Sequence, residues 1–127
     1  MSKKLKNPPQ DPRDRELWLQ NAVGILLFKN IRDYAINKIS KNVTIEQKKE
    51  IIQGIDNAVY GLMMVMDGVT GELKNENYTV RIENKMLLEE NGERILEIDT
   101  LDSDGMCMGF QSWKENDFGD FEIVCDE

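Results

Sequence analysis

Histidine is absent from all 127 positions of the chain. This absence excludes the Ser-His-Asp and Cys-His arrangements of nucleophilic catalysis and the usual ligand sets of catalytic zinc. A Gly-x-Gly sequence, typical of loops that bind nucleotide phosphates, is also missing. The chain has 24 aspartates and glutamates, so a close carboxylate pair has almost no value as a sign of acid–base catalysis. We therefore expect no enzymatic activity, no cofactor and no metal site.

Long apolar runs are missing as well. A membrane-spanning helix needs about 20 apolar residues in succession, and the longest uncharged stretch in helix-like sequence, residues 57–66, is much shorter. The basic N-terminus MSKKLKNPPQDPRDR is not followed by the apolar segment of a signal peptide. We expect a cytoplasmic protein without membrane contact, in which Cys107 and Cys125 are reduced thiols.

Proline is scarce, and its three copies all lie within the first 12 residues. Residues 1–10 are rich in lysine and proline and show no periodic pattern, which predicts a flexible basic tail. Residues 11–127 have the length of one ordinary domain. We interpret them as a single α+β domain.

Two long helices are predicted in the first half of the chain. Asp11 before Pro12 is typical of a helix N-terminus and begins a helix that should run to about Ile39. The sequence TIEQ, residues 44–47, fits a capping box and begins a second helix, residues 45–67, which should end at Gly68. A short loop makes the two helices antiparallel neighbours. Glycines spaced by seven on the second helix predict a close approach of another element, at Gly54, Gly61 and Gly68.

The second half of the chain shows the alternation typical of strands, beginning at residues 78–82. Asn91-Gly92 predicts a type I′ hairpin that pairs Glu89 with Arg94, Leu88 with Ile95 and Leu87 with Leu96. A turn near residues 84–85 would complete a three-stranded meander, and further strands are expected at residues 106–113 and 121–125. The predicted fold is α+β, with two long antiparallel N-terminal helices packed on one face of a C-terminal antiparallel sheet of about four to five strands.

Positive charge is scarce near the C-terminus. Residues 83–127 contain 14 acidic and 3 basic residues, within a chain of net charge −8. Such a region repels phosphates, so we expect no binding to nucleic acid. It attracts a basic protein and speeds the encounter with it. Solubility alone would account for the same charge.

The segment MCMGFQSWKENDFGDFE, residues 106–122, mixes aromatic and methionine side chains with acids. Apolar side chains anchor a bound protein, and carboxylates complement its lysines and arginines. We therefore assign Trp113 and Phe118 as anchors, and the complementary charges are Asp102, Asp104, Glu115, Asp117 and Asp120. For Met106, Met108 and Phe110 we favour a place in the core. The loop DTLDSDG, residues 99–105, lacks the first carboxylate and the bidentate glutamate of a calcium loop and is interpreted as an acidic turn.

The stretch YGLMMVMDG, residues 60–68, places three methionines within four residues. On the predicted helix most of it belongs to the core, which leaves Tyr60, Met64 and Asp67 for outside contacts. An alternative function is a small-molecule-binding or enzymatic domain. Its pocket would lie between the second helix and the sheet, with Asp56, Tyr60 and Asp67 as polar groups.

The stretch YGLMMVMDG followed by DSDGMCMGFQSWKENDFGDFE, residues 102–122, resembles small bacterial proteins of toxin–immunity loci. The resemblance implies a small, cytoplasmic, non-enzymatic immunity protein that masks a cognate toxin, frequently a basic nuclease. It covers about half of the chain and carries over no functional residues. Our first hypothesis is therefore toxin neutralisation by an acidic C-terminal surface. A homo-oligomer whose acidic surface serves only solubility is a third possibility.

Overall fold

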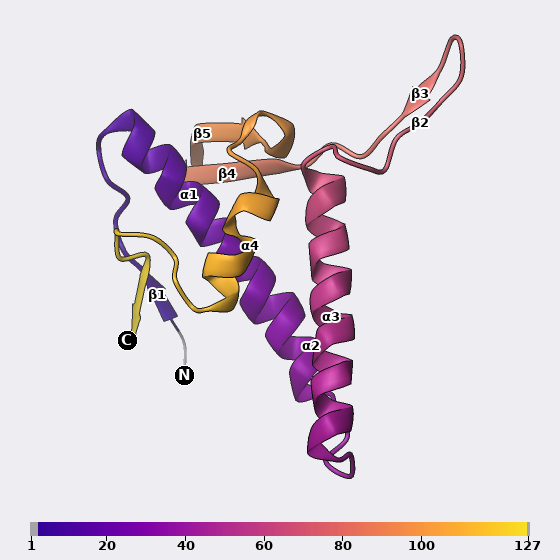
Figure 1. The fold of residues 1–127 in the computed structure, drawn as a ribbon. Helices are drawn as coiled ribbons and strands as arrows, with labels where there is room; N and C mark the ends of the chain where they lie inside the picture. The colour runs from indigo at the N-terminus through magenta and orange to yellow at the C-terminus, as the bar shows by residue number, and fades with distance from the viewer. Residues whose placement is uncertain (1–2, 127) are drawn as a thin grey trace.

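The computed structural model describes residues 3–126 and shows an α+β protein with three helical units (Figure 1). The two long helical units are closest at the loop that joins them and diverge from there, and the third helix, α4 (Met106–Lys114), lies between them. Within residues 3–126 no sheet has more than two strands. The predicted sheet of four to five strands with both helices on one face is therefore not formed.

The first helical unit begins as predicted. It consists of α1 (Pro12–Leu27), a π-helical turn, η1 (Phe28–Arg32), and α2 (Asp33–Asn37). Asp11 caps it, because its side chain accepts a hydrogen bond from the amide of Asp14 at 3.1 Å. The π-helical turn was not predicted, since its residues match an ordinary helical pattern.

The second helical unit, α3 (Ile45–Met66), confirms the predicted capping box. The amide of Gln47 donates to the Thr44 hydroxyl at 3.1 Å, and the Gln47 side chain accepts from the Thr44 amide at 2.9 Å. The helix ends just before Gly68, as predicted. It packs against α4, η1 and α2. The predicted close approach is wrong at Gly54 and Gly61, where a side chain would meet open space, but it is found at Gly68, where a Cβ would run into the Leu101 side chain.

The hairpin of β4 (Lys85–Glu90) and β5 (Glu93–Asp99) turns at Asn91 and Gly92, which have positive φ angles of 51° and 85°. The type I′ turn is thus confirmed, as is the pair of Glu89 and Arg94. Beyond that pair the predicted register is wrong by one residue. A bulge at Leu88/Glu89 makes Leu88 face Leu96 and Leu87 face Glu97. The core side of the hairpin packs on α1.

A second hairpin replaces the predicted meander. β2 (Leu73–Lys74) pairs with β3 (Thr79–Val80), and this hairpin leaves the body of the protein beyond the end of α3 (Figure 1). We call residues 69–83 the arm; all of them are exposed. The Asn75 side chain accepts from the amides of Asn77 and Tyr78, at 3.0 and 2.9 Å. This local turn pairs residues 79–80 with β2 instead of β4.

Residues 106–113, predicted as a strand, form α4. Met106, Phe110 and Trp113 are spaced by four and three, which places them on one side of a helix. Met106 and Trp113 are buried, and Phe110 is half-buried against the same core. The alternation of Met106, Met108 and Phe110 is therefore misleading, since Met108 points to solvent.

The first and last described segments of the chain lie side by side. β1 (Lys3–Leu5), within the segment predicted to be a flexible tail, pairs antiparallel with β6 (Val124–Asp126). Lys6 continues this contact, because its amide donates to the carbonyl of Ile123 at 2.8 Å. Ile123 belongs to the core, whose other buried apolar members are Trp18, Leu19, Phe28, Val59, Met63, Met86, Leu88, Met106 and Trp113.

Candidate functional site

Trp113, assigned from the sequence as an anchor for a partner, is a core residue with 4% of its surface exposed. Its indole N–H donates to Oδ1 of Asn21 at 2.8 Å, and its ring stands edge-on to Phe28 with centroids 6.2 Å apart. Two glycines, Gly24 of α1 and Gly109 of α4, leave room for the ring. Trp113 therefore joins α4 to α1, and this interior position corrects the assignment.

Asp104, assigned as a charge for a partner, is engaged with α1. Its Oδ1 accepts from Nη2 of Arg13 at 3.0 Å and its Oδ2 from Nε2 of Gln20 at 2.9 Å. Its own amide donates to Oε1 of Gln20 at 3.1 Å. The hydrogen bond from Arg13, followed by that from Gln20, lowers the pKa of Asp104 below its ordinary value. Asp104 thus fixes the start of α4 on α1, although its carboxylate keeps a partly exposed edge.

Two adjoining hollows lie where α1 meets α4 and the loop that follows it. Their volumes are about 220 and 240 Å³. The two hollows share four lining residues: Leu17, Asn21, Asp117 and Gly119. We call the combined surface of the two hollows the acidic groove. Aspartates also line its remaining parts, namely Asp14, Asp104 and Asp120. Among its lining residues there is no lysine or arginine.

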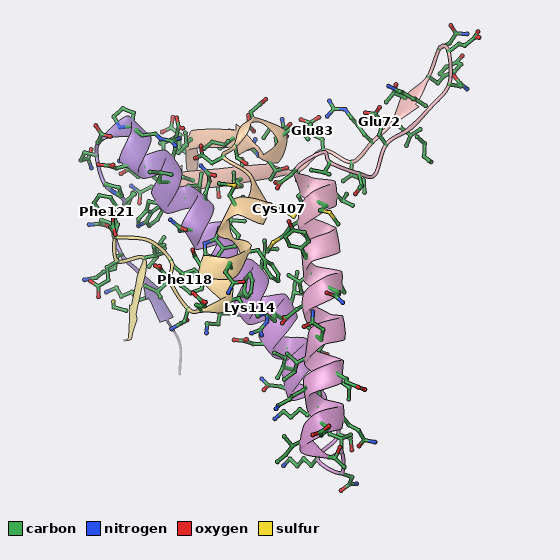
Figure 2. The ribbon with its side chains drawn as sticks, viewed as in Figure 1. Glu72, Glu83, Cys107, Lys114, Phe118 and Phe121 are labelled. Atoms are coloured by element: carbon green, nitrogen blue, oxygen red, sulfur yellow. The ribbon has the colours of Figure 1, made fainter. Side chains whose placement is uncertain are left out.

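Exposed apolar side chains lie among these carboxylates. Leu17, Met108 and Phe121 line the acidic groove and are exposed, and Phe118 lines it half-buried. Figure 2 shows Phe118 and Phe121 on one side of the molecule. The arm, which contains Glu72 and Glu83, lies on the opposite side. The groove therefore offers apolar area and negative charge together.

The structure brings most of the assigned residues to this groove but leaves two outside its lining. Asp104, Trp113, Asp117, Phe118 and Asp120 line it. Asp102 is exposed at the end of a short 3₁₀ turn, η2 (Thr100–Asp102), and Glu115 is exposed at the end of α4.

The contribution of α1 to the groove was missed. Asp14 and Leu17 are ordinary helix residues in the sequence, and only the packing of α4 on α1 gives them a place here. A sequence signal did exist. Gly24 and Gly109 are the two helical glycines that leave room for Trp113, and they mark the close approach of the two helices.

The residues assigned to an alternative pocket hold the three helical units together. Asp56 is 4% exposed and forms ion pairs with Arg32 and with Nζ of Lys114, the latter at 3.5 Å. Asp67 accepts hydrogen bonds from the amides of Met106 and Cys107. Both carboxylates are therefore paired with groups of the chain itself.

Tyr60, the third of these residues, stands edge-on to Phe110 with ring centroids 5.1 Å apart. Hydrogen bonding with Cys107 raises the pKa of the Tyr60 hydroxyl. Burial, followed by the nearby Asp67, raises the pKa of the Cys107 thiol. Both groups are protonated at neutral pH, and a protonated thiol is a poor nucleophile.

No protein family model, curated protein or solved structure matches this chain. Within residues 3–126, no three cysteine, aspartate or glutamate side chains gather in the way that a metal ion requires. In the same part of the chain, no helix combines the length and apolar character needed to cross a membrane.

Proposed function

We propose that this chain is a non-enzymatic protein-binding domain that engages a basic protein at the acidic groove. One observation carries the proposal. Four aspartates from three separate segments line two adjoining hollows together with exposed apolar side chains: Asp14 of α1, Asp104 before α4, whose charge is paired with Arg13, and Asp117 and Asp120 after α4. Apolar anchors surrounded by a polar rim are typical of protein interfaces.

In this proposal the apolar and charged groups have different roles. Leu17, Met108 and Phe121 supply area that loses water on binding, and this loss drives affinity. Asp117 and Asp120 are exposed and attract lysine and arginine side chains of the partner. Attraction between opposite net charges increases the association rate, and salt weakens it. We therefore expect association that is fast at low salt and slows as salt is added.

The partner that we propose is a toxin, and the chain is then its immunity protein. Support comes from the resemblance of residues 60–68 and 102–122 to proteins of toxin–immunity loci and from the net charge of −8. The mechanism is masking. The acidic groove covers a basic active site, such as that of a nuclease, and prevents its substrate from entering. The pocket alternative lacks comparable support, since Asp56 and Asp67 are paired inside the chain.

A photo-crosslinking amino acid at Met108 tests the proposal directly. Met108 is 79% exposed in the acidic groove, and Ile45, the first residue of α3 and outside the groove lining, provides a matched control with 78% exposure. Illumination in cells that produce the chain should crosslink the Met108 variant, and not the Ile45 variant, to one basic protein. Equal crosslinking from both positions, or a product that is not basic, would count against the acidic groove.

A further inference from the structure

The arm has one apolar face and one polar face. Leu73 lies opposite Val80 in the register of β2 and β3, so both side chains share a face. Tyr78 precedes β3 directly and Ile82 follows it by two residues, and both are exposed apolar side chains of the same arm. These four side chains are 62–74% exposed. The other face of β2 and β3 carries Lys74 and Thr79, which lie opposite each other in the register.

An isolated arm of this kind is incomplete. A two-stranded hairpin without further packing is marginally stable in water, and an uncovered apolar strand pair is a template for association. The arm extends beyond the end of α3, away from the helices (Figure 1). Its four apolar side chains remain largely exposed to solvent, although Ile82 lies beside Val65 and Leu101 at the base of the arm.

A second apolar feature lies on the other side of the molecule. A groove of about 300 Å³ runs between α1, β4 and the β1–β6 pair, and every residue that lines it is apolar. Three of these residues are exposed, at 58%, 59% and 38%: Leu5, Leu26 and Leu87. We call it the apolar groove. The arm points away from β1 (Figure 1), so it does not fill the groove of its own chain.

We propose that two copies of this chain exchange arms, each inserting its apolar face into the apolar groove of the other. Each chain has one arm and one groove, so a symmetric pair covers both features on both chains. A single arm face is small compared with the roughly 800 Å² per partner of a standard interface. Reciprocal exchange doubles the area buried, because each chain contributes both an arm and a groove.

The charge of the arm favours binding in the apolar groove over binding in the acidic groove. The arm has three glutamates and two basic residues, hence a net negative charge. The residues that line the apolar groove carry no charge, whereas Asp14, Asp117 and Asp120 line the acidic groove and would repel the arm. The two grooves lie on opposite sides of α1, since Leu17 and Asn21 face one and Ala22 and Leu26 the other.

Sedimentation equilibrium of the full chain tests the exchange. We expect a concentration-dependent species of twice the 14.7 kDa chain mass. Val80→Asp on the arm should raise the dimer dissociation constant at least about tenfold, because it places a charge in the apolar groove. Thr79→Asp, the neighbouring residue on the polar face, is the matched control and should leave the dimer nearly unchanged. Both residues are exposed, so neither variant threatens the fold.

The groove side needs its own pair of variants. Leu26→Glu should weaken the dimer as Val80→Asp does, whereas Asn37→Glu, at an exposed position of α2 outside the groove, should not. A mixture of Val80→Cys chains with Leu26→Cys chains should form an intermolecular disulfide between these two positions on mild oxidation, located by peptide mapping.

Two results would overturn the exchange. One is a chain that remains monomeric at millimolar concentration. The other is a dimer that Val80→Asp and Leu26→Glu leave intact. Neither result affects the acidic groove, whose crosslinking at Met108 is measured separately.

Discussion

Asp67 at the end of α3 caps the N-terminus of α4, with its Oδ1 2.6 Å from the amide nitrogen of Met106. Its Oδ2 accepts from the amide of Cys107 at 2.8 Å. The residue that precedes α4, Gly105, has no side chain to perform this capping. A carboxylate is favoured at this end of a helix, where free N–H groups and the positive end of the dipole meet. Asp67 therefore holds α4 in the position from which it forms the acidic groove with α1.

Removing this cap should loosen α4. Asp67→Ala leaves two amides without their partner, and we expect the free energy of unfolding to fall by about 1–3 kcal/mol. Urea denaturation gives the magnitude, and hydrogen exchange of the α4 amides shows where protection is lost. Asp102→Ala removes an exposed carboxylate nearby and is the control. Equal effects of the two substitutions would show that the cap has no special role.

Alanine in place of glycine should have opposite effects in different helices. At Gly24 and Gly109 a Cβ would run into the Trp113 ring, and such overpacking costs about 1–3 kcal/mol. At Gly54 and Gly61 a Cβ meets open space, so helix propensity alone acts and should stabilise by about 0.5–1 kcal/mol. Thermal unfolding of the four variants shows whether each substitution raises or lowers the stability. Stabilisation by Gly109→Ala would mean that α4 does not pack closely on α1.

The interaction of Asp104 with Arg13 should depend on pH. The pKa of Asp104 is lower in the folded state than in the unfolded chain, where a carboxyl titrates near about 3.9. Its stabilisation is therefore complete above the unfolded pKa and is lost as the pH falls through the folded pKa. Because Asp104 is partly exposed, we expect Asp104→Asn to cost at most about 1 kcal/mol near neutral pH.

Urea titrations of the wild type and of Asp104→Asn at several pH values provide the measurement. The difference in stability should be constant above about pH 5 and should shrink below about pH 4. A difference that grows toward low pH would have the wrong sign for a carboxylate stabilised in its charged form.

The buried charge of Asp56 should matter far more than an exposed one. Asp56→Asn leaves Arg32 and Lys114 without their counter-ion in a largely buried place, and we expect a loss of about 3 kcal/mol. Asp33→Asn removes the exposed partner of Lys29 and should cost less than about 1 kcal/mol. Denaturation at neutral pH compares the two. Similar losses would indicate that solvent reaches Asp56.

The correct predictions from sequence concern local chemistry. The Asp11 cap, the box of Thr44 and Gln47, and the Asn91-Gly92 turn each depend on residues within a few positions of one another. The local backbone determines such features, so a short stretch of sequence suffices to predict them.

The wrong predictions concern segments whose structure is determined by contacts between residues far apart in the sequence. Met106–Trp113 carries both an alternating and a helical pattern, and the capping by Asp67, 39 residues earlier, is what begins a helix there. The strand predicted at residues 78–82 exists in part as β3 but finds its partner in β2 through the Asn75 turn. The bulge beside Leu88 also could not be predicted, because the strand register was derived by counting residues outward from the turn.

The candidate site was predicted in part. The acids after α4 follow from local composition, because an Asp-rich loop with glycine has few ways to be buried. Trp113 was misassigned, since only the approach of Gly24, 89 positions earlier, shows that α1 covers its ring. The share of the groove that α1 supplies could not be predicted without the contact between α1 and α4.

The most direct test of the central claim is the affinity of the basic partner for two charge-reversed variants. Asp117→Lys with Asp120→Lys changes the acidic groove, and Glu46→Lys with Glu50→Lys changes the exposed start of α3 by the same total charge. Measured at low and at physiological salt, the groove variant should bind at least about tenfold more weakly, with a lower association rate and a reduced salt dependence. The α3 variant should bind nearly as the wild type does. Equal loss in both variants would contradict the assignment of binding to the acidic groove.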